Sequence, residues 1–389
     1  MPILLGVDEA GYGPNYGPLC VAASAWQVAE GEPSGFRAQG SKLNGQGRTI
    51  KRAAERTPAE DGLPDLYRLL RKAVARTPDK AGRKIAIADS KALYSPGAGL
   101  RQLERGVLAA LLAIGDDATS DTAHGGQPLP GRTPRCINRV SELLAATGAD
   151  PHGRRGELAC HAGDEQVLPI GSPAEEICRL AALLRKTCTD NGTVLLALRA
   201  RLVYPAEFNE LVDHFGSKGA ALSHVTLQLV REAIDLAALP ASSALPTAAA
   251  AQRAAGAAPY ATRVFVCLDK HGGRNRYAGL LQHHFPESWI EPIAENRNRS
   301  RYRWMYGATP IEAVFRVGCE ELLPTALASM AAKYHRELAM RAFNSFWTAR
   351  LPELRPTAGY PNDSHRFRAA IAAAQSELGI ADRLVWRNR

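Results

Sequence analysis

Two adjacent acids, Asp8 and Glu9, follow a short apolar run near the start of the chain and precede a glycine-rich turn. A second apolar run, 19–25, comes after the turn, so the pattern predicts a strand, a tight turn and an antiparallel strand. Neighbouring side chains on a strand point to opposite faces. Carboxylates at the end of a buried strand are costly unless a cation neutralises them, and hard oxygen ligands suit Mg²⁺ or Mn²⁺. The alternative is a surface turn with solvated acids.

A third acid has the same setting far downstream. Asp269 follows the apolar run 264–268, as expected for a metal ligand at the end of a buried strand. The alternative is a structural aspartate with satisfied hydrogen bonds.

Five short motifs in a fixed order resemble those of one enzyme family, the type II ribonucleases H. They are GVDEAGYGPNYGP at the N-terminus, ADSKAL at 88–93, VFVCLD at 264–269, ASMAAK at 328–333 with Arg336, Glu337 and Met340 behind it, and Gly359-Tyr360 with His365. The family's opening signature is roughly GxDEAGRGPxxGP. The resemblance covers about half of the chain, and the stretches between the motifs are not matched.

The resemblance implies an endonuclease that uses two divalent ions to hydrolyse the RNA strand of an RNA–DNA hybrid. Two close dications need several carboxylates, and the motifs supply Asp8, Glu9 and Asp269. Counting back from Pro324 places Glu320 at the fourth family position, with Glu321 as the alternative. Both could instead be first-turn helix acids that the helix dipole favours.

The same resemblance suggests which residues contact the substrate. We expect this role for the turn Gly11, Tyr12 and Gly13, for the supporting segment Asp89, Ser90 and Lys91, and for Arg274, Arg301, Lys333, Arg336 and Tyr360. Arginines bind phosphates and aromatic rings stack on bases or sugars, and both types are interleaved between 274 and 306. The alternative for that stretch is a solvated basic loop over a few core aromatics.

One departure from the family pattern concerns specificity. The family's Gly-Arg-Gly turn reads the ribose 2′-hydroxyl, whereas this chain has Tyr12 in place of the arginine. The flanking glycines keep their backbone donors. Unless a nearby arginine replaces the missing one, discrimination between an RNA–DNA hybrid, duplex DNA with one ribonucleotide and other substrates is open.

Composition agrees with a nucleic-acid partner. The chain has 389 residues, 46% of them hydrophobic, and a formal net charge of +9, which suits a polyanion and equally a generic basic surface. Seven irregularly spaced cysteines argue against a disulfide framework. No run approaches the length of a membrane span, so we expect a cytoplasmic protein, acting as a monomer on nucleic acid and not on a membrane.

The periodicities predict an α/β fold, and the resemblance specifies a ribonuclease-H-like mixed sheet flanked by helices, with a C-terminal helical segment and insertions. Strands are expected at 3–8, 18–28, 84–88, 193–204, 263–269, 288–294 and 311–317, and helices at 65–74, 100–114, 172–186, from 206 through 211, 222–237, 320–346 and 363–377. We expect a catalytic core at 1–319, interrupted at about 29–80, 115–170 and 238–260, and a helical part at 320–389 packed on it.

Two other functions fit these residues. One is a structure-specific DNase of the same fold, which activity on branched DNA would favour. The other is a non-catalytic nucleic-acid-binding protein on a decayed nuclease scaffold. Retention of all four acids argues against decay, because unpaired buried acids destabilise a fold.

Overall fold

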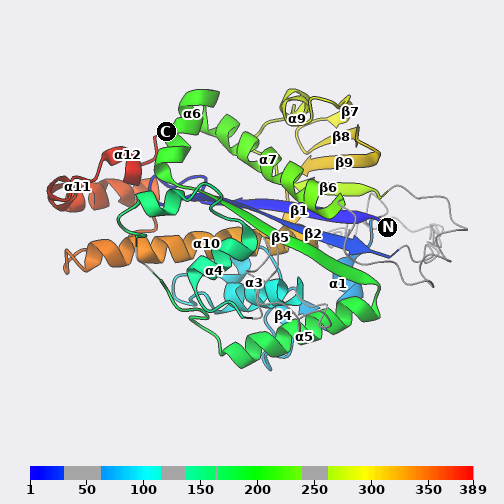
Figure 1. Ribbon diagram of the computed structural model, residues 1–389, viewed down its shortest axis with the longest axis horizontal. Helices are drawn as coiled ribbons and strands as arrows, with labels where there is room; N and C mark the ends of the chain where they lie inside the picture. The colour runs from blue at the N-terminus through cyan, green and yellow to red at the C-terminus, as the bar shows by residue number, and fades with distance from the viewer. Residues whose placement is uncertain (30–62, 115–135, 163–164, 239–261, 389) are drawn as a thin grey trace, which may run out of the picture.

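The computed structural model describes residues 1–29, 63–114, 136–162, 165–238 and 262–388, which fold around one central mixed sheet (Figure 1). The sheet has seven strands in the order β5, β2, β1, β6, β9, β8, β7. Their bounds are β1 Ile3–Ala10, β2 Leu19–Val28, β5 Thr193–Val203, β6 Val264–Leu268, β7 Glu291–Glu295, β8 Arg299–Tyr306 and β9 Thr309–Arg316. The expected mixed α/β sheet with flanking helices is confirmed.

Three parallel strands lie in the middle of the sheet. β1 runs antiparallel to β2 and parallel to β6, and β6 runs parallel to β9. The last aligned residues are Val7 with Leu268 and Leu268 with Phe315. The carboxyl ends of these three strands therefore meet at one edge of the sheet, which is where open α/β sheets bind their ligands.

Helices cover both faces of the sheet. Their bounds are α1 Leu66–Leu69, α2 Ser90–Leu93, α3 Arg101–Ile114, α4 Val140–Thr147, α5 Ala174–Asp190, α6 Pro205–Phe215, α7 Lys218–Ala238, α9 Ala278–His284, α10 Leu323–Thr348, α11 Pro361–Glu377 and α12 Asp382–Val385, with 3-10 turns at Arg154–Glu157 and Cys319–Glu321. α10 packs on β1 and β2 from one side, with α3 and α5 behind it, and α7 packs on the other side (Figure 1). No helix in the described ranges is both long enough and apolar enough to cross a membrane.

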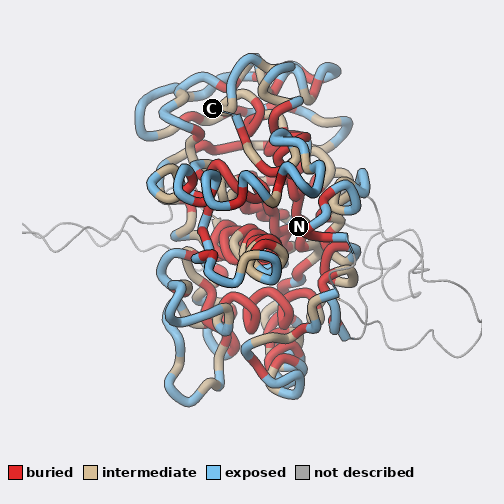
Figure 2. The backbone as a smooth tube through the Cα atoms, turned by 90° about the vertical axis from the view of Figure 1, so that its left-hand side faces the viewer, coloured by how far each residue is buried: buried red, intermediate tan, exposed pale blue. Residues whose placement is uncertain are grey.

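Alternate residues of β1 belong to the two cores on either side of the sheet. Ile3, Leu5 and Val7 pack in the core under α7, whereas Leu4 packs in the core that includes α10. Most residues of α10 are buried, and buried segments run through the middle of the molecule (Figure 2). A Cβ atom on Gly6 would lie 2.1 Å from the backbone nitrogen of Thr325, so β1 and the start of α10 are in direct backbone contact.

Several expected elements differ in the structure. The helix expected at 65–74 ends at Leu69, and the strand expected at 84–88 is the two-residue β4 (Ile85–Ala86). β4 pairs with the equally short β3 (Val74–Ala75) in a separate sheet. β8 and α9 were not expected: their arginines and histidines indicated a basic loop. Parts of the three expected insertions, 30–62, 115–135, 163–164 and 239–261, lie outside the described residues.

Candidate active site

Three of the predicted acids lie at the carboxyl edge of the parallel strands. Because Val7 is aligned with Leu268, the next residues along β1 and β6 are Asp8 and Asp269, which come side by side. Glu320 follows the end of β9 through a turn at Gly318, whose φ of 78° is in the left-handed region that favours glycine. The local topology thus brings together residues more than 250 positions apart in the sequence.

The electrostatics show that these acids interact. Burial raises the pKa of Asp8, and the neighbouring charges of Asp269 and Glu320 raise it further. Burial and then the charges of Asp8 and Asp269 raise the pKa of Glu9. Burial and the charge of Glu320 raise the pKa of Asp269. Asp8, Glu9 and Asp269 therefore share one region with Glu320, and burial and the neighbouring charges disfavour ionisation of these three acids. A cation would reverse this effect.

One atom in this cluster fits a metal ligand. Asp269 Oδ1 is buried and has no hydrogen-bond partner among the described residues. A buried carboxylate oxygen without a partner is rare in folded proteins. Coordination to Mg²⁺ or Mn²⁺ would satisfy it, and the four carboxylates are the hard oxygen donors that these ions prefer. Among the described residues, the ligand atoms of these acids do not form a group within 4.8 Å of one another.

Residues 89–91 lie next to the acidic cluster and are connected to it through Ser329 and Lys91. Asp8 forms a side-chain hydrogen bond with Ser329 of α10. Ser329 Oγ is 3.1 Å from Ser90 Oγ, and the backbone N–H of Ser90 donates to Ser329 Oγ. Asp89 caps α2 by accepting from the backbone N–H of Lys91. Asp89, and then Asp8, Glu320 and Asp269, raise the pKa of Lys91, so its ammonium faces the acidic cluster.

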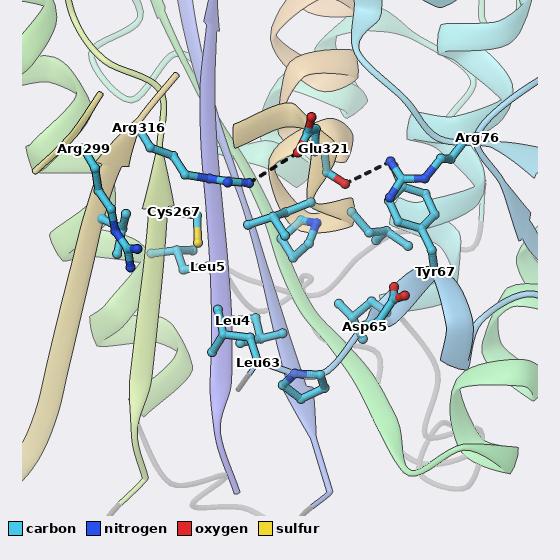
Figure 3. Close-up of a pocket in the computed structure, with 16 residues that line it drawn as sticks. Leu4, Leu5, Leu63, Asp65, Tyr67, Arg76, Cys267, Arg299, Arg316 and Glu321 are labelled. Carbon is cyan, nitrogen blue, oxygen red and sulfur yellow. Dashed lines mark hydrogen bonds and ion pairs between the residues drawn. The ribbon is translucent and has the colours of Figure 1, made fainter. Parts of the chain in front are cut away.

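Glu320 and Glu321 point to different surroundings. Glu320 interacts with Asp8 and Asp269, as described above. Glu321 is exposed and lies between Arg316 and Arg76 at a separate pocket lined by the start of β1 (Figure 3). Its carboxylate is 3.8 Å from Arg316 Nη2, and its carbonyl oxygen accepts from Arg76. This placement favours Glu320 over Glu321 as the fourth acid.

The glycine turn after β1 is held by two buried arginines. Arg336 is 2% exposed, and its guanidinium donates to the carbonyl oxygens of Pro18 and Ala358, each at 3.0 Å. A Cβ atom on Gly11, where φ is +86°, would lie 2.6 Å from Arg336 Cδ. Arg387 is 1% exposed and donates to the carbonyl oxygen of Gly11. Arg336, which we expected to steer the substrate backbone, instead shapes the turn from inside.

Tyr12, in the place of the family arginine, has two cationic neighbours. Lys218 Nζ lies 5.0 Å from the centre of the Tyr12 ring. Burial raises the pKa of Tyr12, the charge of Glu9 adds to this rise, and the charge of Arg274 opposes it. Glu9, Tyr12 and Arg274 are therefore close enough to act on one another. The predicted substrate residue Arg274 lies near Tyr12, on the loop that follows β6.

Tyr360 and Gly13 lie together on the outer side of the turn. Tyr360 is 48% exposed, and a Cβ atom on Gly13 would be 3.8 Å from its ring. Lys333 lies one turn after Ser329 on α10, where it forms an ion pair of 2.6 Å with Glu337 and sits 4.7 Å from the centre of the Tyr94 ring. Tyr360 is thus accessible to a ligand, and Lys333 is engaged with its neighbours.

The arginine-rich run at 299–306 is the strand β8, not a loop. Arg301 forms an ion pair with Glu312 of β9, and β6 and β9 separate β8 from β1. Tyr302 and Trp304 are buried in the core. The structure therefore does not bring Arg301 into the acidic cluster, and these two aromatic rings are not available to stack on bases.

Sequence reasoning missed three residues at this site. They are Ser329, Lys218 and Arg387, none of which was assigned a role. Ser329 is the serine of the ASMAAK motif, so a signal for it was present. Nothing in the local pattern around Lys218 or Arg387 indicates that they lie against a turn at the other end of the chain.

Comparisons with known proteins give the following findings. No protein-family model and no curated protein sequence matches this chain. Similar solved structures include the complex of PCNA with RNase HII from Archaeoglobus fulgidus, at 12% identity over 100% of this chain and 94% of that chain, with a TM-score of 0.35. Another is ribonuclease H2 from Pyrococcus horikoshii OT3, at 13% identity over 98% and 92%, with a TM-score of 0.34.

Proposed function

We propose that this protein is a metal-dependent endonuclease that hydrolyses the RNA strand of RNA–DNA hybrids and leaves 3′-hydroxyl and 5′-phosphate ends. The observation that supports the proposal is the electrostatic interaction among Asp8, Glu9, Asp269 and Glu320 near the carboxyl edge of three parallel strands. The sequence motifs in which these acids occur support the same function.

Asp8, Glu9, Asp269 and Glu320 would hold two Mg²⁺ or Mn²⁺ ions. When bound, such ions activate a water molecule for attack on the phosphodiester and stabilise the leaving oxygen. The chain's own part is to hold the carboxylates in place: Ser329 hydrogen-bonds Asp8, and the backbone N–H groups of Lys270 and Gly318 hydrogen-bond Asp269.

Other residues near the acids are suited to hold the nucleic acid. Lys91 places positive charge beside the acids and Arg274 places it near Tyr12, and both charges favour binding of phosphates. The exposed ring of Tyr360 next to Gly13 offers a surface on which a sugar or base can pack. The buried arginine Arg336 fixes the backbone of the turn.

Because Tyr12 replaces the arginine of the family signature, the substrate could be an RNA-containing duplex or DNA alone. With tyrosine in the turn, reading of the 2′-hydroxyl would rest on the backbone N–H groups of the turn and on Arg274 nearby. If these do not replace the family arginine, the same acids would cut branched or plain DNA. A substrate panel separates the two possibilities.

The test uses two neighbouring glutamates as a matched pair. Glu320→Gln and Glu321→Gln each remove one charge from adjacent residues of the same 3-10 turn. They are compared with the parent on an end-labelled RNA–DNA hybrid, a DNA duplex with one ribonucleotide, and plain and branched DNA, in Mg²⁺ and in Mn²⁺. Hybrid binding and melting temperature are measured alongside.

We expect Glu320→Gln to lower hybrid cleavage at least 100-fold while binding stays within about threefold, because it removes a ligand and not a phosphate contact. Glu321→Gln should stay within about threefold of the parent in both. Equal activity of the two variants would contradict the assignment of Glu320. If the protein cuts branched or plain DNA in preference to the hybrid, it is a DNase and not a ribonuclease. Binding without any cutting would indicate a non-catalytic protein.

A further inference from the structure

Three histidines from two helices converge on the side of the sheet covered by α7. His224 comes from α7, and His283 and His284 come from the end of α9. The ligand atoms of these three side chains all lie within 4.8 Å of one another. Among the described His, Cys, Asp and Glu residues, no other group of three or more ligand atoms comes this close together. None of them belongs to the acidic cluster described above.

The spacing of the three rings is close to that of a metal centre. His224 Nδ1 and His284 Nε2 are 3.0 Å apart, and the ring centres of His224 and His283 are 4.8 Å apart. Two imidazole nitrogens bound to one zinc ion at tetrahedral angles lie about 3.4 Å apart, given Zn–N bonds of about 2.0–2.1 Å. Rotations of the exposed His283 side chain would be enough to complete such a set.

The surroundings hold two of the rings in position. Phe215 stacks on His224 with ring centres 3.7 Å apart and an interplanar angle of 9°. Arg231 of α7 donates to the backbone carbonyl of His284 at 2.6 Å. Ring orientation fixed by neighbouring groups is what metal-binding histidines require.

The charge state also suits a metal. Burial lowers the pKa of His284 to about 4, and burial and the neighbouring His283 lower the pKa of His224. Neutral imidazoles offer lone pairs to a cation, whereas a phosphate would need them protonated. Imidazole nitrogens are poor ligands for Mg²⁺ or Ca²⁺, which prefer oxygen, and good ones for a borderline ion such as Zn²⁺.

We propose that His224, His283 and His284 bind one Zn²⁺ ion that joins α7 to α9 and keeps its fourth coordination position for an exchangeable ligand. This site is independent of the acids that would hold Mg²⁺ or Mn²⁺. α7 carries Lys218 and Gly219 against Tyr12, so the ion would fix the helix that borders the glycine turn.

The test titrates Zn²⁺ into protein that has no affinity tag and has been freed of metal by a chelator. Three chains are compared: Asp269→Asn as the parent, so that the acidic cluster does not account for binding, and this parent with either His283→Ala or His152→Ala. His283 and His152 are both exposed, so neither substitution leaves a cavity in the core. Co²⁺ absorption in the visible range and the melting temperature are recorded for the same samples.

We expect the parent to bind one equivalent of Zn²⁺ and to show the intense visible bands of tetrahedral Co²⁺. Loss of a group that only orients a ligand costs roughly 10–100-fold in affinity, so removal of the ligand His283 should cost at least about 100-fold. His152→Ala should bind as the parent does. Zn²⁺ should raise the melting temperature of the parent and of His152→Ala but not of His283→Ala. Absence of binding in the parent, or equal binding by His283→Ala with its metal-free melting temperature unchanged, would overturn the site.

Discussion

Substitution of Gly6 by alanine tests whether the contact between β1 and α10 positions the acids. A Cβ atom at Gly6 would lie 2.1 Å from the backbone nitrogen of Thr325 and 2.2 Å from the carbonyl carbon of Pro324. Carbon contacts of this kind normally begin near 3.4 Å. The clash is with backbone atoms, which no side-chain rotation can relieve, so β1 and α10 must separate by about 1 Å or more.

Two consequences follow for Gly6→Ala. Overpacking in a core costs about 1–3 kcal/mol, and a backbone clash places this one at the upper end, so we expect a loss of about 3 kcal/mol in the free energy of unfolding. Asp8 lies two residues further along β1, and its partner Ser329 is on α10. A displacement of about 1 Å between catalytic groups costs roughly 100-fold in rate, so kcat on the hybrid should fall by about that factor.

The assays are urea unfolding in the presence of a chelator and hybrid cleavage at saturating Mg²⁺. Gly279→Ala is the matched control, because Gly279 is exposed on α9 with nothing within 4 Å of its added Cβ atom. Alanine there should be neutral or stabilise the helix by up to about 1 kcal/mol. A Gly6→Ala protein within about 0.5 kcal/mol of the parent and fully active would refute the reasoning.

Three further outcomes are expected. Because the pKa of Asp8 is raised in the folded protein, ionisation of Asp8 opposes folding as pH rises above the normal carboxyl range. In thermal melts with a chelator present, Asp8→Asn should therefore stabilise the protein, and more at pH 8 than at pH 5. A variant less stable than the parent at both pH values would contradict this. Arg336→Met leaves the buried carbonyl of Pro18 and the partly buried carbonyl of Ala358 without this donor, and should cost about 2–3 kcal/mol in urea unfolding with hybrid affinity of the folded protein unchanged. Lost affinity at full stability would restore its predicted contact with substrate. Tyr12→Arg introduces the arginine of the type II ribonuclease H signature. In competition cleavage it should raise the preference for RNA-containing duplexes over plain DNA about tenfold, which corresponds to about 1.4 kcal/mol. An unchanged preference would show that the turn does not read the sugar.

The sequence indicates two acids of this edge directly, because Asp8 and Asp269 each come after an apolar run of strand length. Asp8 and Asp269 follow such runs directly, and the structure aligns the two strands so that these residues are neighbours. The expected hairpin of the first two strands and the long helix near residue 330 are also confirmed. These elements have strong periodicity and clear ends, so local pattern is enough.

The elements and contacts that the sequence did not predict also have physical causes. In β8, Ser300, Tyr302 and Trp304 are buried and alternate with arginines, a two-residue period that the density of positive charge obscures. The seven-residue α9 is too short for a helical period to stand out. Arg336 and Lys333 are three residues apart on α10, and spacing alone does not tell which of them is enclosed by the turn that follows β1. Such outcomes depend on tertiary packing.

The place of β1 in the sheet has a consequence for synthesis of the chain. β1 can pair with β2 almost as soon as both leave the ribosome, but its other neighbour, β6, begins at Val264. Until then one edge of β1 has no partner strand, and exposed strand edges invite pairing with other chains. Asp8 meets Asp269 only once β6 is in place. A nascent chain would therefore bring the two acids together late in its own production.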